Sequence, residues 1–207
     1  MQNLNKRMRI APVQRRSSET IERLLASTAK LLEEVGFDNI TTNMICRHAG
    51  VTPPSLYRYF PDKYGVMEAL GLQLVNAQDG ALEKWATADI KQLRKPENMF
   101  EMLRAQYLIT RDFPGGKWIA RAMHASPNLA QIRIQSSDKI VAMWVHLQLD
   151  ATPGLDIEMV AKKYLLATEM GYSAIEMLLD RPEIDVDETL REVSELVAYI
   201  LKDLPIE

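Results

Sequence analysis

A glycine-centred turn between two short helical segments, in residues 41–63, limits the folds open to this chain more than any other feature. Thr41 is a good N-cap for the first segment, and Gly50 ends it because glycine readily takes the positive φ of a tight turn. Thr52 can cap the second segment, which Pro61 ends because proline cannot continue the helical hydrogen-bond ladder. The sequence therefore predicts two short helices joined at an angle.

The rest of the chain shows the three-and-four spacing of apolar residues that is typical of amphipathic helices. Ile21, Leu24, Leu25 and Leu32 form such a stripe in a first helix that ends before Gly36. No sustained alternation of period two and no Asn-Gly or Asp-Gly hairpin turn predicts a strand. Further helices are expected near residues 62–85, 97–111, 117–125, 128–149, 156–180 and 187–203. We therefore expect an all-α protein of about nine helices.

Charge is distributed unevenly along the 207 residues. Residues 1–70 carry 10 Lys and Arg against 7 Asp and Glu, whereas residues 71–207 carry 15 against 21. The basic residues before Ser17 come without one acidic residue; they are Lys6, Arg7, Arg9, Arg15 and Arg16. This asymmetry favours a polyanion as the partner of the N-terminal part, although a solvated tail explains the arm equally well. We expect residues 1–16 to form a flexible basic arm.

Several functional classes lack their sequence signals. A single cysteine, Cys46, excludes an intrachain disulfide, and His48, His124 and His146 have no metal-ligand spacing. Nucleophile elbow, Walker loop and dinucleotide-binding glycine pattern are absent from the sequence. No apolar run approaches the roughly 20 residues of a membrane span, and the N-terminus is too polar for a signal peptide. We therefore expect a cytoplasmic protein that is not an enzyme and uses no metal, cofactor or membrane.

The second helix of the turn has two faces of different chemistry. Leu56, Tyr59 and Phe60 suit burial against the first helix. The other face carries Thr52, Ser55, Tyr57 and Arg58. Hydroxyl and guanidinium groups on a short exposed helix suit base edges in the major groove of DNA. Arg58 can donate two hydrogen bonds to a guanine or hold a phosphate.

Residues 18–70 resemble the DNA-binding domain of the TetR family of transcriptional regulators. The matching segments, in order, are Gly36-Phe37, Thr41-Thr42, Ile45-Cys46, Ala49-Gly50-Val51-Thr52, Leu56-Tyr57-Arg58-Tyr59-Phe60 and Asp62-Lys63. The resemblance implies a helix-turn-helix DNA-binding domain at 17–63 and a helical effector-binding and dimerisation domain at 64–207. It also implies that Thr42 and Lys63 clamp the DNA backbone.

Two positions depart from the family pattern. Pro53-Pro54 removes two backbone donors from the start of the second helix, which places contacts from this turn in doubt. Cys46 stands where alanine is usual, and we interpret it as a small core residue. The predicted DNA-binding residues are Thr41, Thr42, Thr52, Ser55, Tyr57, Arg58 and Lys63. For the threonines that open helices, plain capping is the alternative reading.

The family resemblance also implies a small-molecule effector and a homodimer. Bulky aromatic and flexible methionine side chains suit an apolar, adaptable pocket, although such residues also build ordinary cores. The candidate effector-binding residues are Tyr107, Trp118, Met123, Met143, Trp144 and Glu169. They favour a hydrophobic or aromatic effector. The helices near 156–180 and 187–203 are the expected dimer interface, with internal packing of the same stripes as the alternative.

Together these features predict a homodimeric repressor that a small, largely apolar effector releases from an inverted-repeat operator in double-stranded DNA. The preference for repression rests on the family resemblance. The alternative is a DNA-binding activator or architectural protein of the same fold that no ligand gates. A helical enzyme is the third reading, which the missing motifs disfavour.

Overall fold

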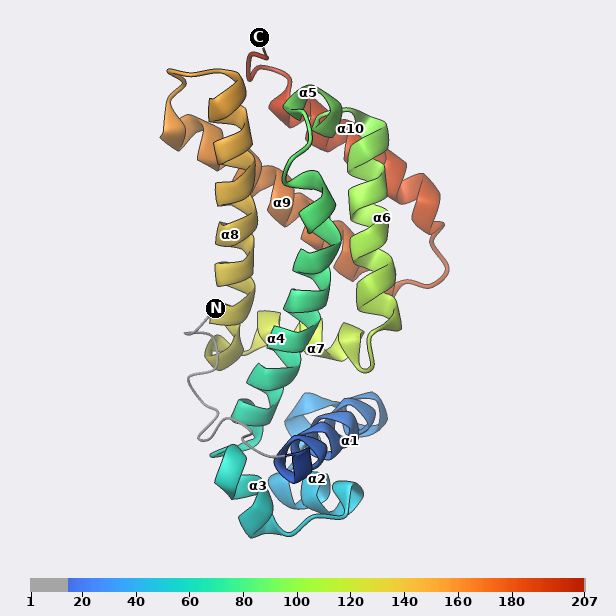
Figure 1. Ribbon diagram of the computed structural model, residues 1–207. Coiled ribbons are helices and arrows are strands. Elements are labelled where there is room, and N and C mark those ends of the chain that lie inside the picture. The colour runs from blue at the N-terminus through green and yellow to red at the C-terminus, as the bar shows by residue number, and fades with distance from the viewer. Residues whose placement is uncertain (1–14, 207) are drawn as a thin grey trace. The chain divides into compact units, whose positions relative to one another are not determined.

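The computed structural model describes residues 15–206, which form α-helices, one short 3-10 turn and no strand. In chain order the helices are α1 (Arg15–Asn39), α2 (Thr42–Ala49), α3 (Pro53–Tyr59), α4 (Lys63–Leu82), the 3-10 turn η1 (Glu83–Trp85), α5 (Ile90–Leu93), α6 (Pro96–Asp112), α7 (Gly116–Ala125), α8 (Pro127–Ala151), α9 (Ile157–Asp180) and α10 (Val186–Leu201). The all-α prediction is confirmed (Figure 1). Within residues 15–206 there are ten α-helices, where about nine were expected for the chain.

The additional helix is α5, a single turn capped by Asp89, whose carboxylate accepts a hydrogen bond of 2.8 Å from the Lys91 N–H. The fourth helix ends at Leu82 and continues as the 3-10 turn, so the helical winding tightens before Trp85. The basic arm expected at residues 1–16 lies outside the described residues, except for Arg15 and Arg16, which begin α1.

The chain forms two compact units. Unit 1 comprises the described residues up to Asn76 together with Asp112–Arg133, and unit 2 comprises Ala77–Arg111 and the described residues from Ile134 on. Helices α4 and α8 each begin in unit 1 and end in unit 2. These units are defined by packing, and the functional boundary between residues 63 and 64 that the sequence suggests stays a prediction.

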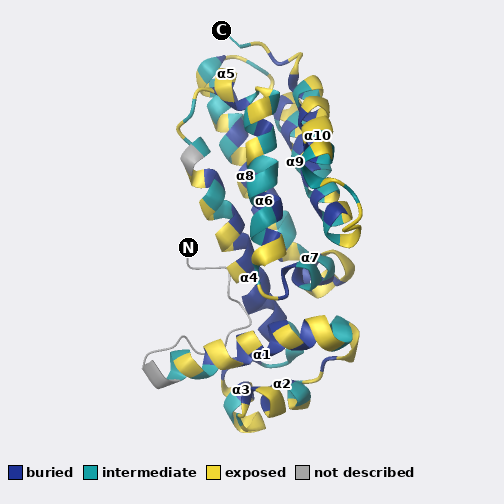
Figure 2. Cartoon of the chain, turned by 90° about the vertical axis from the view of Figure 1, so that its right-hand side faces the viewer, coloured by how far each residue is buried: buried dark blue, intermediate teal, exposed yellow. Residues whose placement is uncertain are grey.

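Unit 1 is built on the apolar stripe of α1, which packs against α2 and α7. Leu24 and Leu32 are fully buried in this core, where Leu56, Phe60 and Ile119 meet them. Exposed residues alternate with buried ones along α1, as an amphipathic helix requires (Figure 2). Gly36, with φ 72° and ψ 165°, interrupts α1 near the predicted end, and a short helical segment follows to Asn39.

The turn between α2 and α3 has the predicted chemistry. The Thr41 hydroxyl accepts a hydrogen bond of 3.2 Å from the Met44 N–H and so caps α2. Gly50 takes the left-handed conformation, with φ 62° and ψ 39°. The Arg23 guanidinium of α1 donates to the carbonyls of Ala49 and Gly50, so the turn is also fastened to the first helix.

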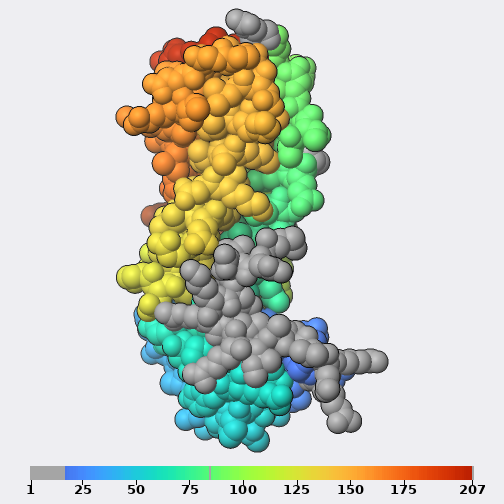
Figure 3. Space-filling model, turned by 60° about the vertical axis from the view of Figure 1, so that its left-hand side comes forward, coloured from blue at the N-terminus to red at the C-terminus, as the bar shows by residue number. Residues whose placement is uncertain are grey.

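Unit 2 consists of the later part of α4 with α5, most of α6 and α8, and all of α9 and α10. Helices α9 and α10 pack side by side (Figure 1). The carboxylates of Asp156 and Asp185 cap them, accepting 2.9 and 2.7 Å hydrogen bonds from the N–H groups of Glu158 and Glu188. In the space-filling view, α8 and the beginning of α9 form one continuous face of this unit (Figure 3).

Candidate DNA-binding surface and ligand cavity

Helix α3 has one buried face and one exposed face, as the sequence predicts. Leu56 and Phe60 are fully buried and Tyr59 is buried, so they anchor the helix in the core of unit 1. Tyr57 is 42% exposed, Arg58 is exposed and Ser55 is partly exposed. The exposed face of α3 therefore presents a guanidinium and hydroxyl groups from a helix that cannot rotate without exposing its apolar anchors.

Two of the predicted DNA-binding residues meet across the turn. The hydroxyls of Thr42, in α2, and Tyr57, in α3, lie 3.0 Å apart at hydrogen-bond distance. A second hydroxyl pair joins Thr52 and Ser55, also at 3.0 Å. These contacts fix the directions of four hydroxyl-bearing side chains at the exposed end of unit 1. The hydroxyls of Thr52 and Ser55 keep acceptor capacity for a further partner.

The start of α3 has few backbone N–H groups that could donate to a ligand. Pro53 and Pro54 have no N–H, and the N–H of Ser55 donates to the Thr52 carbonyl at 2.9 Å. The Leu56 N–H donates to the same carbonyl. An anion at this end of α3 would therefore be held by side chains. This agrees with the expectation from the sequence that Pro53 and Pro54 remove backbone donors here.

Lys63 opens α4 and is engaged within unit 1. Its ammonium donates to the carbonyls of Phe37 and Asp38, at 3.0 and 3.2 Å, and lies 4.6 Å from the centroid of the Phe37 ring. Because an ammonium carries three donors, one stays available while the other two hold the end of α1. The role of Lys63 as a phosphate clamp stays a prediction.

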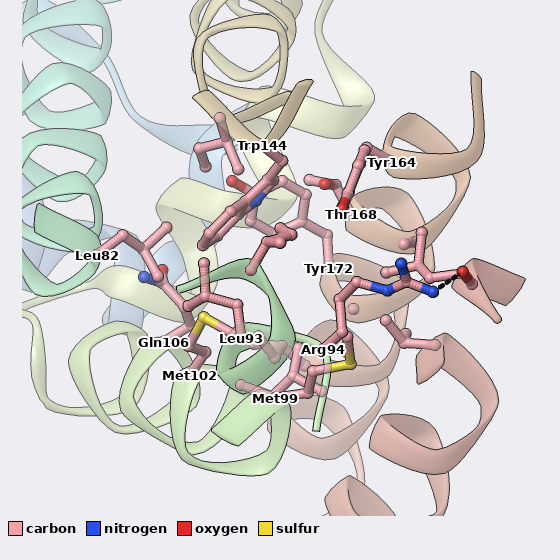
Figure 4. A pocket seen from close by; sticks show the side chains of 18 residues that line it. Leu82, Leu93, Arg94, Met99, Met102, Gln106, Trp144, Tyr164, Thr168 and Tyr172 are labelled. Carbon is pink, nitrogen blue, oxygen red and sulfur yellow. Dashed lines mark hydrogen bonds between the residues drawn. The ribbon is translucent and has the colours of Figure 1, made fainter. Parts of the chain in front are cut away.

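Unit 2 contains an apolar cavity of about 110 Å³ (Figure 4). Its lining comes from α4, α5, α6, α8, α9 and α10, with Arg94, the residue that follows α5. The lining residues are Leu82, Ile90, Leu93, Arg94, Met99, Met102, Leu103, Gln106, Ile140, Trp144, Tyr164, Ala167, Thr168, Gly171, Tyr172, Ile175, Val197 and Leu201.

Of the six residues predicted to bind an effector, Trp144 alone lines this cavity. Tyr107 lies in a neighbouring apolar cluster of unit 2, and Met143 packs beside the main core of that unit. Trp118 and Met123 belong to unit 1. Glu169 accepts a hydrogen bond of 2.9 Å from the Ser137 hydroxyl. The structure therefore does not bring these six side chains together, and the roles of the five outside the cavity stay predictions.

A closed ring of buried hydrogen bonds borders the cavity at Gln106. The side-chain nitrogen of Gln106 donates to the backbone carbonyl of Gln78, and the side-chain nitrogen of Gln78 donates to the Thr110 hydroxyl. That hydroxyl donates to the backbone carbonyl of Gln106, and each of the three hydrogen bonds is 2.8 Å long. The side-chain oxygen of Gln106 is buried and has no hydrogen-bond partner. An unpaired buried acceptor costs free energy, so this side of the cavity wall carries an unsatisfied polar atom.

A second polar group at the cavity is Arg94. Its guanidinium donates to the carbonyls of Leu201 and Leu204, and its Nε is buried with no hydrogen-bond partner. Burial lowers the pKa of Arg94, and the nearby Tyr164 opposes that change. Burial also raises the pKa of Tyr164 to about 12, and its hydroxyl donates 3.0 Å to the Gln148 side-chain oxygen.

Helices α9 and α10 carry large apolar side chains that are exposed in the single chain. They are Ile157, Met159, Leu165, Leu166 and Met177 on α9, and Leu196 and Tyr199 on α10. Leu196 is 54% exposed and Tyr199 is 64% exposed. Exposed large apolar side chains on two adjacent helices are typical of a protein–protein contact surface.

Residues 15–206 offer neither a metal-binding cluster nor a membrane-spanning helix. No cluster of three or more His, Cys, Asp or Glu side chains in that part of the chain is arranged to hold a metal ion. Within residues 15–206, the helices are all too short or too polar to cross a bilayer.

Comparison with known proteins identifies unit 1. Residues 24–70 match the family model described as "Bacterial regulatory proteins, tetR family". No curated protein matched the sequence. Among solved structures, a Syntrophomonas wolfei protein described as a TetR-family transcriptional regulator is 15% identical, with a TM-score of 0.71, and the match covers 91% of this chain and 97% of that one.

Other solved structures agree with this match. A TetR-family transcriptional regulator from Streptomyces coelicolor is 18% identical, with a TM-score of 0.59 and coverage of 90% of this chain and 99% of that chain. A TetR-family transcription regulator from Marinobacter aquaeolei is 16% identical, with a TM-score of 0.60 and coverage of 89% and 96%. At these identities the likeness shows the fold.

The geometry of α2 and α3 and these matches define a helix-turn-helix domain. More narrowly, its N-terminal domain is of the TetR type, and the chain has the fold of solved TetR-family transcriptional regulators. The family resemblance seen in the sequence is confirmed.

Proposed function

We propose that the protein is a homodimeric, sequence-specific repressor that a small, largely apolar effector releases from an inverted-repeat operator. The exposed face of α3 carries this proposal. Ser55, Tyr57 and Arg58 stand on a helix that Leu56 and Phe60 anchor in the core, the arrangement that a recognition helix needs in the major groove. Arg58 reads a base edge, and hydroxyls near the turn hold phosphates.

The phosphate contacts in this proposal come from the side chains of Thr41, Thr42 and Lys63. The start of α2 supports this assignment because the first N–H groups of a helix and its dipole favour an anion. At α3, Pro53 and Pro54 remove such donors. Side-chain hydroxyls therefore carry more of the binding at α3 than backbone groups do.

DNA selection from a random pool at stated salt tests the first part of the proposal, because phosphate binding depends strongly on salt. An inverted repeat among the selected sequences is expected. Arg58→Ala should then lower the specific affinity by about 5- to 150-fold, the range that corresponds to 1–3 kcal/mol for one base-reading arginine. Arg181→Ala, which removes an exposed arginine after α9, is the matched control. Unchanged specificity in Arg58→Ala would contradict the assignment of α3.

The dimer in this proposal forms through α9 and α10. Leu166, Leu196 and Tyr199 are each more than half exposed in the single chain, and a second copy would bury them in a two-fold interface. Leu196→Asp should convert a dimer into a monomer in sedimentation analysis, because it places a charge in an apolar interface. Tyr57→Ala, an exposed aromatic of unit 1, is the control. A monomeric wild type at micromolar concentration would contradict the dimer.

The effector in this proposal binds in the cavity of unit 2. Helix α4 continues from unit 1 into unit 2, and its Gln78 is hydrogen-bonded to the cavity residue Gln106. Release of DNA requires the effector to bind the DNA-incompetent state more tightly than the DNA-competent one. The cavity favours this reading over that of a DNA-binding protein which no ligand gates.

A further inference from the structure

The cavity of unit 2 has a large apolar part. Its volume is about 110 Å³, it is partly open to solvent, and buried residues such as Leu93, Met99 and Ile140 belong to its lining. An engineered apolar cavity of about 150 Å³ in another protein holds a single benzene. The apolar part therefore suits a body of about one ring, with flexible side chains such as Met99 adjusting around it.

The cavity also has a polar side, where residues of three segments meet. The Tyr164 hydroxyl donates to the side-chain oxygen of Gln148 at 3.0 Å, and the Arg94 guanidinium donates to the same oxygen at 3.5 Å. Thr168 follows Tyr164 by one turn of α9, so the two side chains share one face of that helix. Arg94, Tyr164 and Thr168 all line the cavity, and Figure 4 shows Tyr164 beside Thr168. The polar group of a ligand is therefore expected at this side.

Arg94 brings a positive charge to the polar side. Its guanidinium donates to the backbone carbonyls of Leu201 and Leu204, which orient it but carry no net charge. Within residues 15–206, no Asp or Glu forms an ion pair with it. Tyr164 supplies no anion either, because burial raises its pKa to about 12 and the hydroxyl stays neutral near pH 7. A partly buried cation without a counter-charge favours an anion in the cavity over a cation.

Thr168 supplies a hydrogen-bond donor to the same side. Its side chain is partly exposed, and none of the described residues forms a hydrogen bond with its hydroxyl. Unlike the Gln106 side-chain oxygen, this hydroxyl is not shut off from solvent. A carboxylate can accept the Thr168 O–H near the charge of Arg94. Because Arg94 is partly exposed as well, a carboxylate at this side keeps part of its hydration.

We propose that the cavity binds a small monocarboxylate with an apolar body of about one ring, of which benzoate is the simplest aromatic example. The carboxylate lies beside Arg94 and accepts a hydrogen bond from Thr168, and the ring occupies the apolar part. The inference rests on the proposed effector-binding role of the same cavity. It makes Arg94 and Thr168 the residues that decide which charge the ligand carries.

Titration calorimetry on the full chain at pH 7 tests this with benzoate, benzamide and benzylamine, which share one ring and are an anion, a neutral molecule and a cation. Wild type should bind benzoate at least about 10-fold more tightly than benzamide, and benzylamine most weakly, because the charge of Arg94 separates them. Arg94→Met should lose the preference for benzoate, and Arg94→Lys should keep it. Arg181→Met, which removes an exposed arginine outside the lining, is the matched control and should keep the preference.

A second pair of variants tests the hydrogen bond. Thr168→Val removes the donor at nearly constant shape and should weaken benzoate binding by about 10-fold. Thr168→Ser keeps the hydroxyl and should retain most of the affinity. Equal benzoate affinities in Thr168→Val and wild type would overturn the role of Thr168.

Wild type alone keeps the test decisive if the Arg94 variants fail to fold. Benzamide or benzylamine bound as tightly as benzoate would overturn the preference for an anion, and absence of binding by all three would overturn the cavity as a site for one ring. None of these readouts involves DNA. Benzoate binding without release of the selected operator, measured by fluorescence anisotropy, would support this inference and contradict the ligand-gated part of the proposed function.

Discussion

The two units place their polar functional groups in opposite locations. In unit 1, Ser55, Tyr57 and Arg58 stand outside the core on an anchored helix. In unit 2 the unpaired polar atoms of Arg94 and Gln106 are buried beside a cavity. Unit 1 is therefore suited to a large polyanion that meets its surface, and unit 2 to a small molecule that it encloses. A tightly packed core supports a rigid binding surface, whereas a cavity provides space for a small molecule.

The largest loss of stability is expected from a cavity made in the core of unit 1. Phe60→Ala removes a fully buried aromatic ring that anchors α3, and should lower the free energy of unfolding by about 3–5 kcal/mol. Urea denaturation followed by circular dichroism measures this loss. Tyr57→Ala, one helix face away and 42% exposed, should change the free energy of unfolding by about 0.5 kcal/mol or less. Similar losses of unfolding free energy in both variants would contradict the assignment of one buried and one exposed face to α3.

An intermediate effect is expected from the buried phenol group of Tyr164 in unit 2. Its pKa is raised by burial from near 10 to about 12, so the folded state favours the neutral form. The resulting stability is complete below pH 10 and is lost as the pH rises towards 12. A shift of this size corresponds to roughly 2–3 kcal/mol at the alkaline end.

Denaturation at several pH values between 9 and 12 checks this alkaline loss. Tyr164→Phe should be less stable than wild type at pH 9, because it loses the hydrogen bond to Gln148, but should lose less stability above pH 10. Tyr57→Phe is the matched control, because it removes the same hydroxyl from a tyrosine that is 42% exposed in unit 1. If Tyr164→Phe loses as much unfolding free energy as wild type between pH 10 and 12, another group causes the alkaline loss of stability.

The smallest effect on stability is expected from filling the cavity. Ala167→Leu adds a larger side chain at a position that lines the cavity of unit 2 and should change the free energy of unfolding by about 1 kcal/mol or less. Ala122→Leu makes the same change among the buried residues of unit 1 and should lower the free energy of unfolding by about 1–3 kcal/mol. Equal costs for the two variants would mean that the units do not differ in packing.

The same difference explains which features could be predicted from the sequence. The faces of α3 and the turn at Gly50 follow from local rules of periodicity, capping and backbone freedom, which a short segment contains in full. Trp144 was predicted as a cavity residue because of its size and type. Trp118 and Met123 have the same character, but Met123 lies in the core of unit 1 and Trp118 packs against that core.

Gln106 was not predicted because no local pattern marks it. Its burial and its free oxygen depend on the Gln78 carbonyl, 28 positions earlier in the chain, and on the side chains of several other helices. Helix α5 was missed for a related reason, since four residues are too few for a periodic signal. Contacts between distant segments therefore decide the features of unit 2 that sequence patterns leave open.

The rate at which a reagent modifies Cys46 can report local unfolding of unit 1. Cys46 is the one cysteine of the chain, it is 3% exposed in α2, and burial raises the pKa of its thiol. Thiol reagents can reach it only when α2 separates from the core, so the rate of modification reports local unfolding without an added label. Bound DNA that holds α2 and α3 in place should slow this reaction, and denaturant should accelerate it.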